Sequence, residues 1–557
     1  MHDTPSPESP TESPTESPNR SRDAELIEAG YELGWAGARY AEHTALRHGD
    51  LHMTFAKVDA AANRLANALR GIGLATNDRV AVLLGNSAHS IITQLGIAKA
   101  GLTLVSLNAR HSALEQCQII EDCGPRVVIA GPGFEDSIGE AIAPLAAPPE
   151  VLGIGWRGSE LGSYESLTER ATDSPPRVLV DPERDIIRLF YTSGTTGTPK
   201  GIVYTHAQYY ARLRNFFSAL EYALGTEHSM VHVGPLTHAA GNYVIPYLMR
   251  GACSIILEHF DPDELLDTIE REHANHLLLV PTMITRLLEH IRLGAHDLSS
   301  ISRINYGTAP IPVKTLGHAL DVFGPVFRQH YGLSECPQPV TILYPHEHRV
   351  EEAASTDSPL ASCGRPVVHL DVRIVADQGP TRQADTVGEI VIKARGAAAT
   401  DIWGRPDLRD QTIRDGWLHT GDLGRFDGRG YLHIVGRNKD MIITGGFNVY
   451  AREVEEALQH HPAVLEAAVF GLPDSEWGES ICAYVACKSG QSVSPAALVD
   501  HCRAQIASYK KPRHLVVLDQ LPKNVNGKLD KNAMREHFVR AHGEDPASLR
   551  NSVLARY

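Results

Sequence analysis

A loop of glycine and hydroxyl residues at 191–201 is the first stretch whose composition points to chemistry. It reads Tyr-Thr-Ser-Gly-Thr-Thr-Gly-Thr-Pro-Lys-Gly and lies between two apolar runs, 186–190 and 202–204, that are typical of β-strands. Its glycines let the backbone adopt positive φ, and its hydroxyls and Lys200 supply hydrogen-bond donors and a charge. Because successive N–H groups and hydroxyls can surround several anionic oxygens, this loop is suited to a polyphosphate.

The loop does not fit the P-loop pattern G-x-x-x-x-G-K-[ST], the nearest generic phosphate motif. Counting from Gly194, Pro199 takes the place of the second glycine, and Gly201 follows the lysine where Ser or Thr is required. A P-loop also begins a helix, whereas β-branched residues follow here. The sequence therefore argues against a P-loop phosphotransferase. Taken alone, such a cluster is more often an ordinary surface turn.

Length, charge and composition exclude several classes of protein. The 557 residues are too many for one core, so two or three domains are expected. The net charge of −15, without a long basic tract, argues against nucleic acid or an anionic membrane as main partner. The eight cysteines form no C-x-x-C pair, and no apolar stretch is long enough to span a membrane. We expect a cytoplasmic protein with reduced thiols.

The chain from 26 to 436 alternates strands and helices. A strand at 79–84, a helix at 87–100 and a strand at 102–106 predict a βαβ unit with parallel strands. Thr205 and Gln208 have the spacing of a capping box before a further helix. Other strands are predicted near 126–130, 231, 277–280 and 303–306. Several end in loops of small residues, where open α/β sheets bind ligands.

The pattern changes beyond Arg437. A helix at 451–459 and strands near 464–470, 480–487 and 514–519 predict a small α+β unit of roughly 120 residues. The predicted organisation is a tail at 1–25, a large domain at 26–436 and a small domain at 437–557. The tail repeats Pro, Glu, Ser and Thr without apolar residues over 7–18, so we expect it to be disordered.

Seven polar segments follow one another in a fixed order, at 192–201, 235–241, 307–312, 329–335, 417–424, 436–450 and 522–528. Together they resemble the motif series of the adenylate-forming superfamily: acyl-CoA synthetases, peptide-synthetase adenylation domains and firefly luciferase. The resemblance extends from about residue 30 to 540. It implies an α/β fold in which a large N-terminal domain of stacked mixed and parallel sheets with helices carries a small, mobile α+β C-terminal domain.

The resemblance also implies a reaction. Relatives activate a carboxylic acid with ATP, release pyrophosphate, and pass the acyl group from acyl-AMP to a thiol. An acyl-CoA synthetase that uses ATP, Mg²⁺ and coenzyme A is expected, because the segment 440–450 resembles those of acyl-CoA synthetases. A ligase that loads a carrier-protein phosphopantetheine is the alternative, and a homodimer is left open. A regulatory member without activity would lack a catalytic residue, and none is missing.

Four residues are expected to take part in the chemistry: Lys528, Glu335, His238 and Lys200. A carboxylate that attacks the α-phosphorus brings two anions together, so cations are needed where charge develops. By the resemblance, Lys528 bridges carboxylate and phosphate oxygens, and Glu335 binds Mg²⁺ together with Thr196. His238 would gate the carboxylate pocket, although a lone histidine in a turn is more often structural.

The nucleotide site is assigned in the same way. Asp422 is expected to accept both ribose hydroxyls, Tyr331 to stack on adenine, and Arg437 to contact the nucleotide. The full set assigned to ATP or AMP is Thr192, Ser193, Gly194, Thr195, Thr196, Gly197, Lys200, Gly307, Thr308, Ala309, Pro310, His330, Tyr331, Gly332, Ser334, Asp422, Arg437 and Lys528. Gly445 and Gly446 would line the path of coenzyme A, and Lys439 occupies the hinge position.

The predicted acyl pocket contains His238, Asn242, Tyr306 and His330. His330 stands where many relatives have glycine, and Tyr306 where serine or glycine is common. Two bulky side chains that face one cavity should shorten it, which favours a medium-length or aromatic acid over a long saturated chain. The alternative is that His330 points into the core and hydrogen-bonds the backbone.

Overall fold

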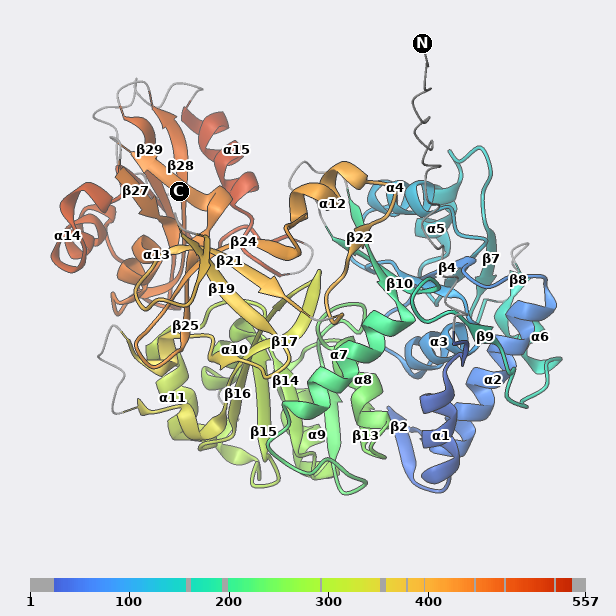
Figure 1. Cartoon of the computed structure of the whole chain (residues 1–557). Coiled ribbons are helices and arrows are strands. Elements are labelled where there is room, and N and C mark those ends of the chain that lie inside the picture. Colours follow the sequence, from blue (N-terminus) through green and yellow to red (C-terminus); the bar gives the residue numbers. More distant parts are fainter. Residues whose placement is uncertain are drawn as a thin grey trace, which may run out of the picture.

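Two large sheets, two smaller ones and a two-stranded sheet form the described part of the chain together with helices, which confirms the predicted α/β fold (Figure 1). The structure, a computed structural model, describes residues 25–156, 162–192, 199–290, 293–350, 357–376, 379–394, 396–444, 447–474, 477–524 and 527–542. Among these residues, no helix combines the length and apolar character needed to cross a membrane.

The first large sheet has eight strands and contains the predicted βαβ unit. Its order is β22 (Asp401–Ile402), β11 (Lys200–Thr205), β10 (Ile186–Thr192), β5 (Thr103–Ser106), β4 (Arg79–Leu83), β6 (Val127–Ala130), β7 (Glu150–Gly153) and β8 (Gly162–Ser163). Strands β4 and β5 are parallel and are joined by α3 (Ala88–Lys99), whose first turn is capped by Ser87. Strands β10 and β11 form an antiparallel hairpin.

The second large sheet has nine strands and is mostly parallel. Its order is β18 (Arg365–Pro366), β17 (Cys336–Leu343), β16 (Phe327–Leu333), β15 (Arg303–Gly307), β14 (His276–Leu279), β12 (Ser229–His232), β13 (Cys253–Ile256), β2 (Thr44–His48) and β3 (Leu51–Thr54). Its central strands are buried on both faces, as expected for a sheet that helices cover on both sides.

Helices fill the layer between the two large sheets and cover their outer faces. The inner layer contains α2 (Phe55–Gly71), α3, α7 (His206–Ser218) and α8 (Gly241–Leu248), against which Met230, Ile256 and Leu278 of the nine-stranded sheet pack. On the opposite face, Val231, Ile255 and Leu277 pack against α9 (Pro262–Glu272), α10 (Pro281–Leu288) and α11 (Val313–Phe323).

The predicted capping box of Thr205 and Gln208 begins α7. Helices α4 (Ala113–Cys123) and α5 (Glu135–Ile142) cover the eight-stranded sheet.

Two smaller sheets complete the fold. One contains β20 (Gly379–Thr381), β19 (Asp371–Ala376), β21 (Gly388–Lys393), β24 (Trp417–Phe426), β23 (Ile413–Arg414) and β25 (Leu432–Arg437). The other contains β27 (Phe447–Tyr450), β26 (Met441–Thr444), β29 (Gly478–Cys487), β28 (Val464–Asp474) and β30 (His514–Leu518). It packs with α13 (Ala451–Gln459) and α14 (Pro495–Gln505), and α15 (Lys531–His542) follows. The chain thus leaves one sheet at Arg437 and enters the next at Met441.

The remaining strands and α-helices of the described residues are short. Strands β1 (Ile27–Glu28) and β9 (Leu179–Val180) form the two-stranded sheet, and the helices are α1 (Tyr31–Arg39), α6 (Tyr164–Glu169) and α12 (Pro406–Thr412). Figure 1 shows the C-terminal part, in orange to red, placed over one end of the large unit. The helix predicted at 451–459 and the three strands predicted after it are confirmed.

Candidate active site

The β10–β11 hairpin holds the two ends of the candidate phosphate loop together. Thr192 is paired with Lys200 in its register, so the loop begins and ends at one point of the sheet. The hydroxyl of Thr192 is buried and has no hydrogen-bond partner within the described part of the chain. Ser193, Gly194, Thr195, Thr196 and Gly197 lie outside the described residues, so their assigned contacts stay predictions.

Lys200 and Glu335 meet, although 135 residues separate them. Lys200 Nζ lies 2.7 Å from Glu335 Oε1. Lys200 begins β11 of the eight-stranded sheet, whereas Glu335 lies in the turn between β16 and β17 of the nine-stranded sheet. The Tyr204 hydroxyl donates to the carbonyl of Ser334 at 2.6 Å and so holds this turn in place. Two residues assigned to the chemistry therefore form one ion pair between the sheets.

The loop after β15 contains a strained residue. Gly307 has no room for a side chain, because a Cβ there would lie 2.2 Å from the carbonyl oxygen of His330. Thr308 follows with φ of +66°, a left-handed conformation that non-glycine residues rarely adopt. Such strain is concentrated at functional sites, which agrees with the assignment of 307–310 to the nucleotide.

Asp422 is the centre of a second polar group. The Tyr331 hydroxyl donates to its Oδ2 at 2.8 Å, and Arg437 Nε donates to its Oδ1 at 3.0 Å. Burial and the neighbouring Asp422 raise the pKa of Tyr331, so its hydroxyl stays protonated and can donate. Three residues assigned to the nucleotide thus come together, from β16, β24 and β25. Whether they bind ribose and adenine stays a prediction.

Lys528 comes to this group from the C-terminal part of the chain. Its side chain is exposed to solvent, but nearby protein removes part of the water around the ammonium group. This desolvation, followed by the positive charge of Arg437, lowers the pKa of Lys528 below the ordinary value of 10.5, whereas the charge of Asp422 raises it. Its backbone N–H donates to Asn524 Oδ1 at 3.1 Å. A lysine of the small unit therefore lies close to the residues assigned to the nucleotide.

His238 lies in the turn before α8. Its Nδ1 is 2.8 Å from Thr237 Oγ1, and its ring packs edge-to-face on Phe190. Burial lowers the pKa of His238 to about 4, and the positive charges of Arg188 and Lys528 contribute to this lowering. The imidazole is therefore neutral at pH 7. Asn242, in the first turn of α8, accepts a hydrogen bond on its backbone carbonyl from Arg212 Nη2 at 2.8 Å.

The structure contradicts the predicted pairing of Tyr306 with His330 in one cavity. Tyr306 is paired with Gln329, and Gly307 with His330, so the two side chains point to opposite faces of the sheet. Tyr306 packs in the core under α9 and α11, where its hydroxyl contacts Gln329 Oε1 and His348 Nε2. Tyr306 is therefore a core residue, and its assignment to the acyl pocket is wrong.

His330 faces the inner helical layer and is buried. Its Nε2 lies 3.0 Å from Asn305 Oδ1 and 3.1 Å from Arg328 Nη1, and its ring packs against Tyr243 of α8. Its polar contacts are made with side chains, which differs from the backbone bond of the alternative interpretation. Burial, followed by the charge of Arg328, lowers the pKa of His330, so it is neutral.

Sequence reasoning missed Arg188 and Arg212. Leu189 and Tyr191 of β10 pack on the side of α4, which leaves Arg188 facing the inner layer beside Phe190. Arg212 enters the same layer from α7. The sequence contains a signal for Arg188, because this charged residue interrupts an otherwise apolar strand.

Comparison with known proteins identifies the family. Residues 33–400 match the family described as AMP-binding enzyme, and residues 453–528 match the AMP-binding enzyme C-terminal domain. The chain belongs to this family. It is 34% identical over 504 residues to a feruloyl-CoA synthase of Amycolatopsis sp, a match that covers 90% of this chain and 97% of that protein.

Two further comparisons agree in reaction class. The enzyme is 33% identical over 529 residues to a medium/long-chain-fatty-acid–CoA ligase of Mycobacterium tuberculosis, which covers 92% of this chain and 90% of the relative. It also resembles a solved anthranilate CoA ligase in complex with anthranoyl-AMP, with 28% identity and a TM-score of 0.83 over 92% of this chain and 97% of that one. The enzyme is an ATP-using acyl-CoA synthetase, which confirms the predicted family and enzyme class.

Proposed function

We propose that this enzyme activates a medium-length or aromatic carboxylic acid as acyl-AMP and then transfers the acyl group to coenzyme A. The observation that carries the proposal is the approach of Lys528 to Arg437, Asp422 and His238. Lys200 and Glu335 form the further ion pair between the two large sheets. Cations from two domains and a neutral histidine thus surround the place where a carboxylate and a nucleotide would meet.

In the first half-reaction an oxygen of the acid attacks the α-phosphorus of ATP. A bond forms between that oxygen and phosphorus, and the bond from phosphorus to the bridging oxygen breaks as pyrophosphate leaves. Lys528 and Lys200 stabilise the negative charge that develops on the oxygens during this step. Because His238 is uncharged, it can border the acid without forming an ion pair that would hold the carboxylate back.

Glu335 is the residue suited to Mg²⁺. Among the described residues, no group of three His, Cys, Asp or Glu side chains could hold a metal without help. A single carboxylate nevertheless fits Mg²⁺, which is usually bound by one or two carboxylates and the substrate phosphates. One oxygen of Glu335 contacts Lys200, and the carboxylate has a second oxygen for the ion. Mg²⁺ supplies charge neutralisation at the phosphates, with Thr196 as a further ligand.

The second half-reaction needs a different arrangement of the small domain. The thiol of coenzyme A attacks the acyl carbon, the bond from that carbon to the AMP oxygen breaks, and the thiol proton passes to solvent. Gly445 and Gly446, which lie outside the described residues, would line the path of the thiol in this proposal. The small domain begins at about Arg437 and turns about Lys439, because Lys528 now lies on the nucleotide side.

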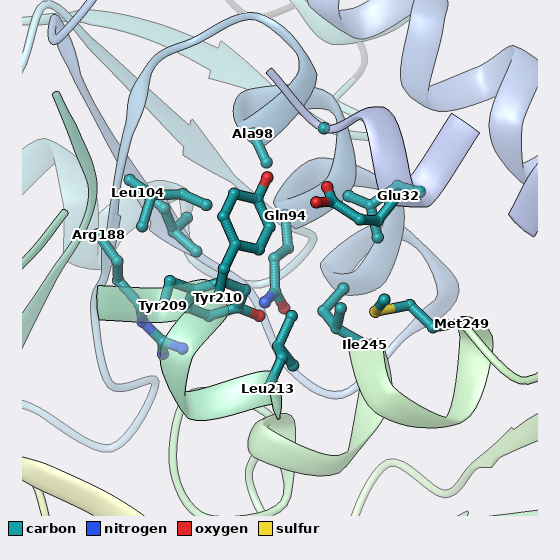
Figure 2. A pocket seen from close by; sticks show the side chains of 13 residues that line it. Glu32, Gln94, Ala98, Leu104, Arg188, Tyr209, Tyr210, Leu213, Ile245 and Met249 are labelled. Atoms are coloured by element: carbon teal, nitrogen blue, oxygen red, sulfur yellow. The ribbon is translucent and has the colours of Figure 1, made fainter. Parts of the chain in front are cut away.

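The acyl pocket is proposed to begin at His238 and Asn242, with His330 in its wall. A mainly apolar cavity, which Ile245 of α8 and Arg188 line, lies nearby (Figure 2). Arg188 connects it to this region, because its Nη2 is 3.4 Å from the carbonyl of Thr237, the residue before His238. Its volume is about 30 Å³ in this structure, so the side chains that line the cavity must move apart to admit a medium-length or aromatic acid.

The test is acid-dependent pyrophosphate release with hexanoate, octanoate, benzoate and palmitate, with and without coenzyme A, followed by mass analysis of the thioester. We expect release with octanoate or benzoate and formation of the acyl-CoA. Glu335→Gln should remove release, whereas Glu227→Gln, at an exposed carboxylate, should not. Absence of acid-dependent release contradicts the function, and preference for palmitate contradicts the pocket. Acylation of a carrier phosphopantetheine in place of coenzyme A would establish the alternative acceptor.

A further inference from the structure

Arg188 is a buried cation beside the proposed acyl pocket. It is 7% exposed and lines the cavity of Figure 2. Its Nη2 has two long contacts, at 3.4 Å to Ser106 Oγ and 3.4 Å to the carbonyl of Thr237, the residue before His238. Its Nε is buried and has no partner among the residues that the structure describes. Burial lowers the pKa of Arg188 to about 10, so it stays charged at pH 7.

Arg212 is a second buried cation close to the first. It is 2% exposed, and its charge contributes to the lowered pKa of Arg188. Its Nη2 donates to the carbonyl of Asn242 at 2.8 Å, and its guanidinium lies 5.8 Å from the ring centroid of Tyr209. Its Nε is also buried without a partner in the described part of the chain. Within that part, neither arginine forms an ion pair with a carboxylate.

Two like charges buried together without a counter-ion are unfavourable. Taking a charge out of water costs several kcal/mol unless a partner and hydrogen bonds offset it. The backbone carbonyls of Thr237 and Asn242 compensate only part of each guanidinium. An arginine is suited to bind a carboxylate through two parallel N–H bonds, and both arginines retain an unused Nε–H. The two arginines therefore need an anion, and the described residues do not supply one.

The cavity limits where such an anion could lie. Arg188 and Glu32 occupy opposite sides of it in Figure 2, and Tyr210 lies between them. Burial raises the pKa of Tyr210, and the charge of Glu32 and a hydrogen bond to it add to this rise. A ligand anion next to Glu32 would be repelled, whereas one bound to Arg188, on the opposite side of the cavity, would be attracted.

We propose that Arg188 and Arg212 bind a second carboxylate on the acid, so that the preferred substrates are medium-length or aromatic dicarboxylic acids. This inference rests on the proposed function and specifies its substrate class. One carboxylate is activated at Lys528, and the other accepts the unused N–H groups of the two arginines. The two arginines are specificity-determining residues that contact the substrate away from the reacting atoms.

The experiment measures kcat/KM for pyrophosphate release on acids matched in carbon skeleton. Glutarate is compared with valerate, and isophthalate with benzoate. We expect the wild-type enzyme to prefer the diacid in at least one pair. Arg188→Met should reduce kcat/KM for that diacid by about 30-fold or more, since a buried charge pair is broken, and leave the monoacid within about threefold. Arg212→Met should act in the same direction.

Arg214→Met is the matched control, because Arg214 lies on the same helix with an exposed side chain. It should change neither rate. The melting temperature of wild-type enzyme should also rise with the preferred diacid alone and not with its monoacid, and Arg188→Met should remove this rise. If Arg188→Met fails to fold, the Arg212→Met variant and the preference of the wild-type enzyme still test the proposed carboxylate site.

The failure of this inference is distinguishable from the failure of the proposed function. Equal or better activity of the wild-type enzyme on both monoacids overturns the inference and leaves the function standing. An equal effect of Arg188→Met on diacid and monoacid also overturns it, because that result indicates a structural role. Absence of pyrophosphate release with every acid instead contradicts the proposed function.

Discussion

Replacing Lys528 with alanine should separate the two half-reactions. The side chain is exposed, and the hydrogen bond to Asn524 is made by the backbone N–H, which alanine retains. The free energy of unfolding should therefore change by less than about 0.5 kcal/mol. By contrast, loss of one donor to the transition state costs about 2.7–4 kcal/mol, or roughly 10²–10³ in kcat.

Two assays measure this difference. Acid-dependent pyrophosphate release reports adenylation, and conversion of synthetic acyl-AMP plus coenzyme A reports thioester formation. Lys528→Ala should lose the first and keep the second within about threefold. Lys523→Ala is the control, because Lys523 lies in the same segment and pairs with Glu466 at the surface, a contact worth about 0–1 kcal/mol. Equal loss of both half-reactions in Lys528→Ala would refute the role of this lysine.

Three further outcomes are expected. Lys439→Pro, which fixes φ near about −65°, should leave pyrophosphate release intact and impair thioester formation; unchanged acyl-CoA formation would argue against the hinge. Asp422→Asn should raise KM for ATP about 10–100-fold, because it removes a charged hydrogen-bond acceptor. An unchanged KM would contradict contact between Asp422 and the nucleotide. Since burial lowers the pKa of His238 to about 4 from 6.5, its contribution to stability is fully present above pH 6.5 and is lost as the pH falls toward 4. Urea unfolding should then show a smaller acid loss in His238→Gln than in wild type, and parallel pH profiles would contradict this.

The sequence predicted the secondary-structure elements better than the mutual geometry of the candidate site. The capping box of Thr205 and the helix at 451–459 are local features, so their signals lie within a few residues. The contact of Lys200 with Glu335 joins two sheets, and no local pattern encodes it. The low pKa of His238 likewise depends on Arg188 and on burial by distant segments.

The error at Tyr306 has a physical cause. The sequence shows that Tyr306 precedes Gly307, but the face of a strand on which a side chain lies depends on register, and a shift by one residue reverses it. The register that pairs Gly307 with His330 places Tyr306 in the outer core. Arg188 was missed for a related reason, because the sequence shows a charge inside a strand but not whether a carboxylate accompanies it.

An isotope measurement tests the central claim most directly. The preferred acid, labelled with ¹⁸O in both oxygens of the reacting carboxylate, is converted with ATP and coenzyme A, and the nucleotide product is analysed by mass spectrometry. If the carboxylate attacks the α-phosphorus, AMP carries one ¹⁸O atom and the thioester keeps the other. Unlabelled AMP, or label in phosphate together with ADP, would contradict acyl-AMP formation by this enzyme.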